Sequence, residues 1–154
     1  MARYAVEHRL GVQAPPQFVW DAFSDLSAWK DWNPLYSNAE GTLGFGAPLT
    51  LTVTLPGRPP QVIHPVVESW TPDELLHWRL SMLGGMVKSV RYLEIDKLTD
   101  EGCIFSNGEL FDGLLGPLVA RQMRRTLKAG FRAMGEAVKE RAEAAWQATN
   151  PAPT

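Results

Sequence analysis

The stretch GELFDGLLGPL, residues 108–118, decides the fold, because two structural periodicities meet in it. The pattern up to residue 111 predicts a strand over 103–111. From Leu114 to about Trp146, apolar side chains recur every three or four residues, which is the spacing of one face of a helix. The sequence therefore predicts that the last strand of a sheet leads directly into one long amphipathic helix.

Upstream of this junction, the sequence predicts more strands joined by short turns. The alternation of leucine or valine with threonine is clearest in 47–55, and further strands are predicted over 61–70, 75–82 and 87–98. Pro65 lies inside one of these strands, which suggests an edge position or a bulge. Because the links are short, neighbouring strands are expected to be antiparallel.

The first third of the chain predicts one strand and two short helices. The strand covers 3–13, and the helices cover about 16–25 and 26–31. Pro34 ends the second helix, and Trp29 or Trp32 beside it is expected either to plug one end of the barrel or to line the mouth of a pocket. The whole pattern predicts an α+β domain over 1–146, with a flexible tail over 147–154. In it, a curved antiparallel sheet of about seven strands wraps the long helix and leaves a central cavity.

Composition excludes several classes of protein. The chain has 154 residues, of which 45% are hydrophobic and 21% charged, and its net charge is −2, as in an ordinary globular domain. The nearest thing to a basic cluster is confined to one helix, so nucleic-acid binding is not expected; it consists of Arg121, Arg124, Arg125 and Lys128. No signal peptide and no apolar run long enough to span a membrane is recognised, so a cytoplasmic location is expected.

Motifs for metal, cofactor or nucleophilic chemistry are absent from the sequence. The single cysteine, Cys103, excludes an internal disulfide and a cysteine-rich zinc site, and it is expected to be a small buried apolar group. The patterns HExxH, GxSxG, GxGxxG and the P-loop do not occur. We therefore expect no metal and no cofactor, while the oligomeric state stays open, a homodimer included.

Four stretches together resemble a known superfamily: WKDWNP, LHWRL, GELFDGLLGPL and AGFRAMGEAVKERAE. Their order and spacing resemble the START and birch-pollen-allergen-like helix-grip superfamily (SRPBCC), and within it the polyketide cyclase/dehydrase-type bacterial proteins. The resemblance covers residues 3–145 and implies a helix-grip fold with a ligand cavity. The superfamily includes lipid carriers, hormone-binding proteins, aromatic cyclases and hydrolytic relatives, so it selects no reaction. Its members often carry histidine where this chain has Arg91, and histidine or arginine where it has Asn107.

The last two strands carry the polar residues that matter most. If Leu93 pairs near Phe105 or Cys103, Arg91 lies opposite Asn107 or Glu109 on an otherwise apolar inner face. A buried charge needs a partner, so three interpretations stay open. The pair anchors a polar group of a ligand, or forms a structural salt bridge, or lies in solvent in a shifted register.

We therefore expect a protein that binds a small hydrophobic molecule, lipid-like, aromatic or polyketide-like, in the cavity. The residues predicted to line it or to orient the ligand are Trp78, Leu80, Arg91, Leu93, Phe105, Asn107, Glu109, Phe111, Met123 and Leu127. One alternative is a cyclase/dehydratase-like enzyme, with Glu109 as acid or base and Arg91 stabilising an enolate. A second alternative is a protein-interaction module.

Overall fold

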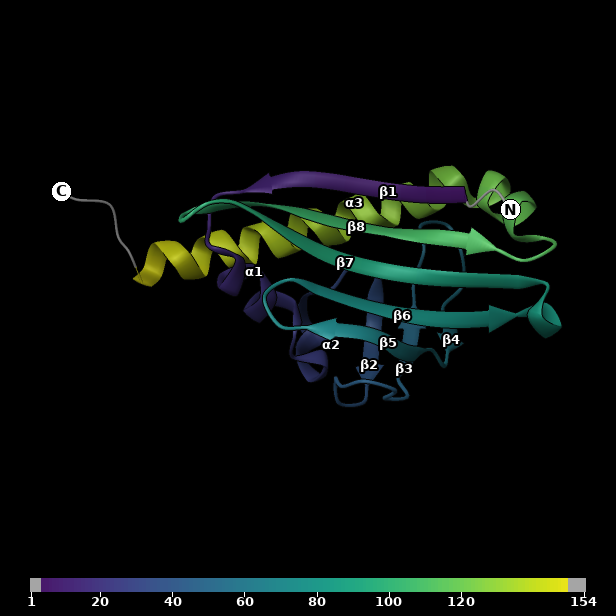
Figure 1. The fold of residues 1–154 in the computed structure, drawn as a ribbon. Coiled ribbons are helices and arrows are strands. Elements are labelled where there is room, and N and C mark those ends of the chain that lie inside the picture. The colour runs from purple at the N-terminus through teal and green to yellow at the C-terminus, as the bar shows by residue number, and fades with distance from the viewer. Residues whose placement is uncertain (1–3, 150–154) are drawn as a thin grey trace.

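The computed structural model describes residues 4–149 (Figure 1). In chain order its elements are β1 (Tyr4–Val12), α1 (Pro16–Phe23), the short 3-10 helix η1 (Leu26–Ala28), α2 (Trp29–Trp32), β2 (Tyr36–Glu40), β3 (Thr50–Val53), β4 (Gln61–Ile63), β5 (Val66–Thr71), β6 (Leu75–Met82), η2 (Leu83–Gly85), β7 (Val87–Thr99), β8 (Gly102–Asp112) and α3 (Gly116–Thr149). The predicted strand-to-helix junction is present, because β8 ends four residues before α3 begins.

The strands form two antiparallel sheets that meet at one corner. The larger sheet has the order β1-β8-β7-β6-β5, and the smaller one has the order β2-β3-β4. An isolated bridge between Pro48 and Val66 joins them. Figure 1 shows the long strands running alongside α3, with the three short strands on the far side of β6 and β5. The predicted α+β helix-grip fold is thus confirmed, with eight strands in the described chain instead of about seven.

Several predicted boundaries were wrong, each for a local reason. The strand predicted over 61–70 is broken into β4 and β5 at His64 and Pro65, because proline has no N–H to donate to a ladder. Strand β2 was missed, since only Tyr36 and Ala39 of its residues are buried and its sequence YSNAE reads as a loop. Helix α3 continues to Thr149, so 147–149 are helical and only 150–154 of the predicted tail lie outside the described residues.

Trp29 plugs the end of the barrel that the short helices close. Its side chain is fully buried, and its indole N–H donates to the Phe23 carbonyl at 2.7 Å. Its ring packs against those of Tyr36 and Trp78, with centroid distances of 5.1 and 6.3 Å. Trp32 stays partly exposed and lies under the Arg141 guanidinium of α3. Of the two expected positions, the end of the barrel and the mouth of a pocket, Trp29 therefore occupies the end of the barrel.

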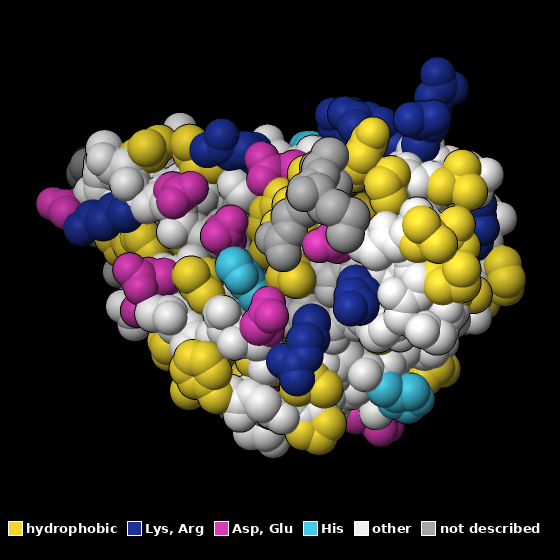
Figure 2. Space-filling model, turned by 45° about the vertical axis from the view of Figure 1, so that its right-hand side comes forward, with side chains coloured by type: hydrophobic (Ala, Val, Ile, Leu, Met, Phe, Trp, Pro, Cys, Tyr) yellow, Lys and Arg dark blue, Asp and Glu magenta, His cyan; other side chains and the backbone are white. Residues whose placement is uncertain are grey.

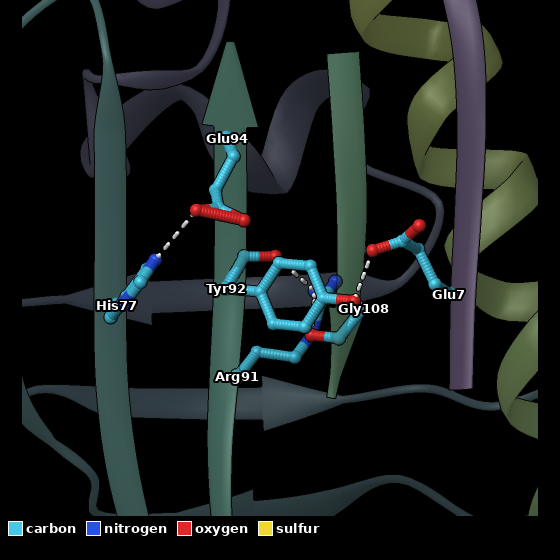
Figure 3. Close-up of polar contacts among 6 residues, drawn as sticks. All are labelled: Glu7, His77, Arg91, Tyr92, Glu94 and Gly108. Carbon is cyan, nitrogen blue, oxygen red and sulfur yellow. Dashed lines mark hydrogen bonds and ion pairs between the residues drawn. The ribbon is translucent and has the colours of Figure 1, made fainter. Parts of the chain in front are cut away.

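The outer face of the large sheet is braced across three strands (Figure 3). The Tyr92 ring on β7 lies over Gly108 of β8, and its hydroxyl donates to the Glu7 carboxylate on β1. Burial and this carboxylate raise the pKa of the Tyr92 phenol above its ordinary value. Beside it, His77 and Glu94 are 3.3 Å apart. Within residues 4–149 no helix is both long and apolar enough to cross a membrane.

Candidate ligand-binding cavity

A cavity of about 270 Å³ lies between the sheets and α3. Its wall combines aliphatic and aromatic side chains with a few polar groups: Leu35, Tyr36, Val53, Leu55, Arg58, Gln61, Ile63, Trp78, Leu80, Met82, Ser89, Arg91, Glu109, Phe111, Val119, Met123, Leu127 and Phe131. A mostly apolar wall with a few convergent polar groups is typical of small-molecule sites.

The cavity opens between the β3–β4 loop and α3. A second pocket adjoins the cavity there. Leu55, Arg58 and Met123 line both, and Pro59 and Pro60 also line the second pocket. The PGRPP turn, residues 56–60, lies at this opening, and all five of its residues are exposed. We take this opening to be the mouth of the cavity.

The register of β7 and β8 places Arg91 directly opposite Glu109. The pairing expected for Leu93 was wrong, because Leu93 pairs with Asn107 and not with Phe105 or Cys103, whereas Glu109 is one of the two partners expected for Arg91. A shift of two residues keeps each side chain on its face, and the inner face was therefore predicted correctly. Both strands turn these residues toward α3 and the cavity.

The Arg91 guanidinium is fully buried and uses all of its donors within the protein. Its Nε donates to the Tyr36 hydroxyl at 3.1 Å. Nη1 donates to the carbonyls of Tyr92 and Gly108, each at 3.0 Å, and Nη2 donates to Asn107 Oδ1 at 2.7 Å and more weakly to a methionine sulfur of α3. Arginine has five N–H donors, so none is left for a ligand.

Aromatic rings and an amide complete the surroundings of this cation. Its guanidinium carbon lies 4.1 Å from the centre of the Phe131 ring on α3, which favours a cation–π contact. The Asn107 amide bridges to the same helix, because its Nδ2 donates to the Phe131 carbonyl at 2.7 Å. Arg91 is therefore a structural centre that ties β2, β7, β8 and α3 together.

Glu109 is left facing the cavity as a carboxyl group without a direct cation partner. No ion pair within 4 Å joins it to Arg91 in the described part of the chain, although the two residues are opposite each other. Burial raises the pKa of Glu109, and the positive charge of Arg91 and a hydrogen bond from Ser89 lower it by less. The described residues therefore contain no salt bridge between Arg91 and Glu109, and the pKa of the Glu109 carboxyl group lies above its ordinary value.

The structure divides the ten predicted site residues into two groups. Seven lie on the cavity wall: Trp78, Leu80, Arg91, Glu109, Phe111, Met123 and Leu127. Leu93, Phe105 and Asn107 are fully buried but lie behind that wall. Sequence reasoning missed Tyr36, Arg58 and Phe131 on the wall. The helical stripe could have found Phe131, whereas Tyr36 lies in a strand that was not recognised.

Other features that could have formed a functional site lie away from this cavity or are missing from the described residues. Cys103 is buried, and desolvation raises the pKa of its thiol to about 11. Among residues 4–149 no cluster of three histidine, cysteine or acidic side chains could hold a metal ion. A wider groove of about 560 Å³ lies on the outer face of β6 to β8, lined by exposed charged residues such as Arg79 and Lys88. We favour the inner cavity as the site, because its wall is mostly apolar and includes the buried polar side chains of Tyr36, Ser89 and Arg91.

The fold and this cavity define a helix-grip protein with an internal cavity. Residues 3–143 match the family model for polyketide cyclase / dehydrase and lipid transport, and the chain belongs to that family. No curated protein matches the sequence.

Solved structures share the fold at low sequence identity. The Zhui aromatase/cyclase from Streptomyces sp. R1128 is 18% identical, with a TM-score of 0.77, over 98% of this chain and 100% of that one. A point mutant of Thalictrum flavum norcoclaurine synthase in complex with a transition-state analogue is 16% identical, with a TM-score of 0.71, over 94% and 96% of the two chains. The di-domain ARO/CYC StfQ of steffimycin biosynthesis is 13% identical, with a TM-score of 0.74, over 93% of this chain and 52% of that one.

Proposed function

We propose that this protein binds one small, mostly apolar molecule, aromatic or polyketide-like, in the cavity between the sheets and α3. The observation that carries the proposal is Glu109, a carboxyl group on an apolar wall that no cation neutralises directly. A ligand that offers a carbonyl or hydroxyl group there gains a hydrogen bond in a site of low dielectric constant. The similar structures include an aromatase/cyclase and a di-domain ARO/CYC protein. Because this chain shares their fold, they support a ring-containing ligand.

The proposal predicts that an apolar probe binds more weakly as the pH rises. A neutral probe such as N-phenyl-1-naphthylamine lowers the dielectric constant around Glu109, so it favours the protonated carboxyl group. Its Kd should therefore be constant below the raised pKa and rise by up to about tenfold per pH unit above it. Fluorescence titration across the pH range in which the protein stays folded measures this.

The matched variant Glu109→Gln keeps the shape of the side chain but cannot ionise. Its Kd for the probe should not change with pH, while the exposed Glu68→Gln should behave like the unchanged protein. Native mass spectrometry of the purified protein and of an organic extract would identify a retained ligand. A cavity that is empty after purification and excludes the probe at every pH would reject the proposal.

A second function, acid–base catalysis, is favoured by the raised pKa of Glu109. A general base or acid works best when its pKa lies near the working pH, and burial without a salt bridge moves a carboxyl group in that direction. In its ionised form Glu109 would take a proton from the carbon beside a ketone, which leaves an enolate, and would return the proton to another position. Arg91 would stabilise the enolate by its charge at a distance, because its donors are occupied.

Deuterium exchange tests this second function without knowledge of the natural substrate. With an aryl β-diketone in heavy water, the protein should accelerate the loss of the proton between the two carbonyl groups, as followed by NMR. Glu109→Gln should lower that acceleration by about 100-fold or more. If Glu109→Gln exchanges as fast as the unchanged protein while both bind the diketone, the catalytic role is rejected and binding remains.

A further inference from the structure

The end of the molecule that carries the cavity mouth also carries protruding apolar side chains. We call them the apolar rim: Leu83, Met86, Leu114 and Leu118, with exposed fractions of 64%, 42%, 79% and 48%. The two segments that carry the rim, residues 83–86 and 114–118, are in contact, since the Leu115 N–H donates to the Met86 carbonyl at 2.8 Å. Figure 2 shows hydrophobic side chains gathered over this end of the molecule. The rim adjoins the cavity, because Leu83 follows Met82 and Leu118 precedes Val119 of the wall.

The fold itself does not require apolar residues at the rim. Leu83 has a φ of +52°, a left-handed conformation that glycine or asparagine adopts more readily than leucine. Its side chain is exposed, so no packing compensates for that strain. Exposed apolar side chains that are grouped at one place mark a surface that meets an apolar partner.

The outer side of α3 next to the rim is purely basic. Four exposed cations follow Leu118 in the first half of the helix; they form the basic face: Arg121, Arg124, Arg125 and Lys128. Three of them lie three, seven and ten residues after Leu118, so they share its side of the helix. No acidic residue occurs over 116–135. Within the described residues none of the four forms an ion pair, whereas Arg132 on the next turn pairs with Glu136 at 3.0 Å.

We propose that the apolar rim and the basic face together dock onto an anionic lipid membrane. Apolar side chains that protrude can insert between lipid tails, while neighbouring cations meet negative headgroups. A protein partner would need pockets that match four protruding side chains, whereas a bilayer surface moulds around them. Docking would bring the cavity mouth close to the membrane, which offers an apolar ligand a path that avoids water. The docking surface does not depend on the function proposed for the cavity.

Vesicle flotation tests the docking surface on the full chain. The protein should float with vesicles of equimolar phosphatidylcholine and phosphatidylglycerol, and not with phosphatidylcholine alone. High salt should weaken the binding, because exposed charges are screened. The double variant Arg121→Gln and Arg125→Gln should lower the partition coefficient about fivefold for each charge removed. Leu114→Gln with Leu118→Gln should lower it about tenfold for each leucine.

The opposite end of the molecule offers a matched control. Leu98 is 63% exposed on the β7–β8 hairpin beside Lys97. The double variant Leu98→Gln and Lys97→Gln therefore removes an exposed apolar side chain and an exposed positive charge at a place away from the apolar rim. This control should bind vesicles like the unchanged protein. An equal loss in the control, or no binding of the folded protein to anionic vesicles, would overturn the proposal. Binding to polyglutamate but to no vesicle would also overturn it and assign the basic face to an acidic protein.

Discussion

Replacing Arg91 by Met should lower the free energy of unfolding by about 3–5 kcal/mol. Methionine fills much of the same space, but it removes the hydrogen bonds that Arg91 donates to the carbonyls of Tyr92 and Gly108 and to the Asn107 side chain. Each buried acceptor that loses its partner costs about 1–3 kcal/mol. Urea denaturation followed by tryptophan fluorescence measures the loss. Arg91→Lys keeps the charge but has fewer donors. Its free energy of unfolding should therefore lie between those of the unchanged protein and Arg91→Met.

A pH series separates the charge of Arg91 from its hydrogen bonds. Glu109 has a raised pKa in the folded state, so the native protein binds more protons than the unfolded chain, and stability falls as the pH rises from about 4.5 to the raised value. Arg91 lowers that pKa, so its removal widens the range over which stability falls. The deficit of Arg91→Met should therefore grow with pH, and that of Arg79→Met, on the exposed face of the sheet, should stay within about 0.5 kcal/mol. An Arg91→Met protein as stable as the unchanged one would contradict the structural role.

Gly108→Ala should be the second large effect, with a loss of about 2–3 kcal/mol of unfolding free energy. A β-carbon at position 108 would lie 2.5 Å from the Tyr92 hydroxyl and 2.6 Å from the Val6 carbonyl. The phenol can move, but only by leaving Glu7, whereas the carbonyl belongs to the neighbouring strand β1. Thermal and chemical denaturation should both show the loss, together with faster hydrogen exchange along β1.

Gly11→Ala is the matched control, because it adds the same methyl group to the same pair of strands. Nothing lies within 4 Å of a β-carbon at Gly11. There the substitution should be neutral or stabilising by up to about 1 kcal/mol, since alanine loses less backbone entropy on folding. If the two variants behaved alike, the packing of Tyr92 over Gly108 would have no energetic importance.

The inner face of the last hairpin was predictable from the sequence, whereas the exact pairing was not. Alternation in β7 and β8 placed Arg91, Asn107 and Glu109 on one face before any register was known. Side chains alternate with a period of two, so an error of two residues changes the partner but not the face. Strand β2 was not predictable in this way, because most of its side chains are polar and exposed, and with it the contact from Tyr36 to Arg91 was missed.

The sequence by itself determined most of the element order, the long helix and which residues of the last hairpin share a face, because these follow from local periodicity. Only the tertiary structure decided which partners Arg91 and Glu109 have. Arg91 meets Tyr36 across 55 residues of sequence and takes its other partners from β7, β8 and α3 instead of binding Glu109. Partner choice depends on which groups the completed fold leaves within hydrogen-bonding distance, and a buried cation such as Arg91 is stabilised when its donors are used. Glu109 thereby stays on the cavity wall without an ion pair to Arg91.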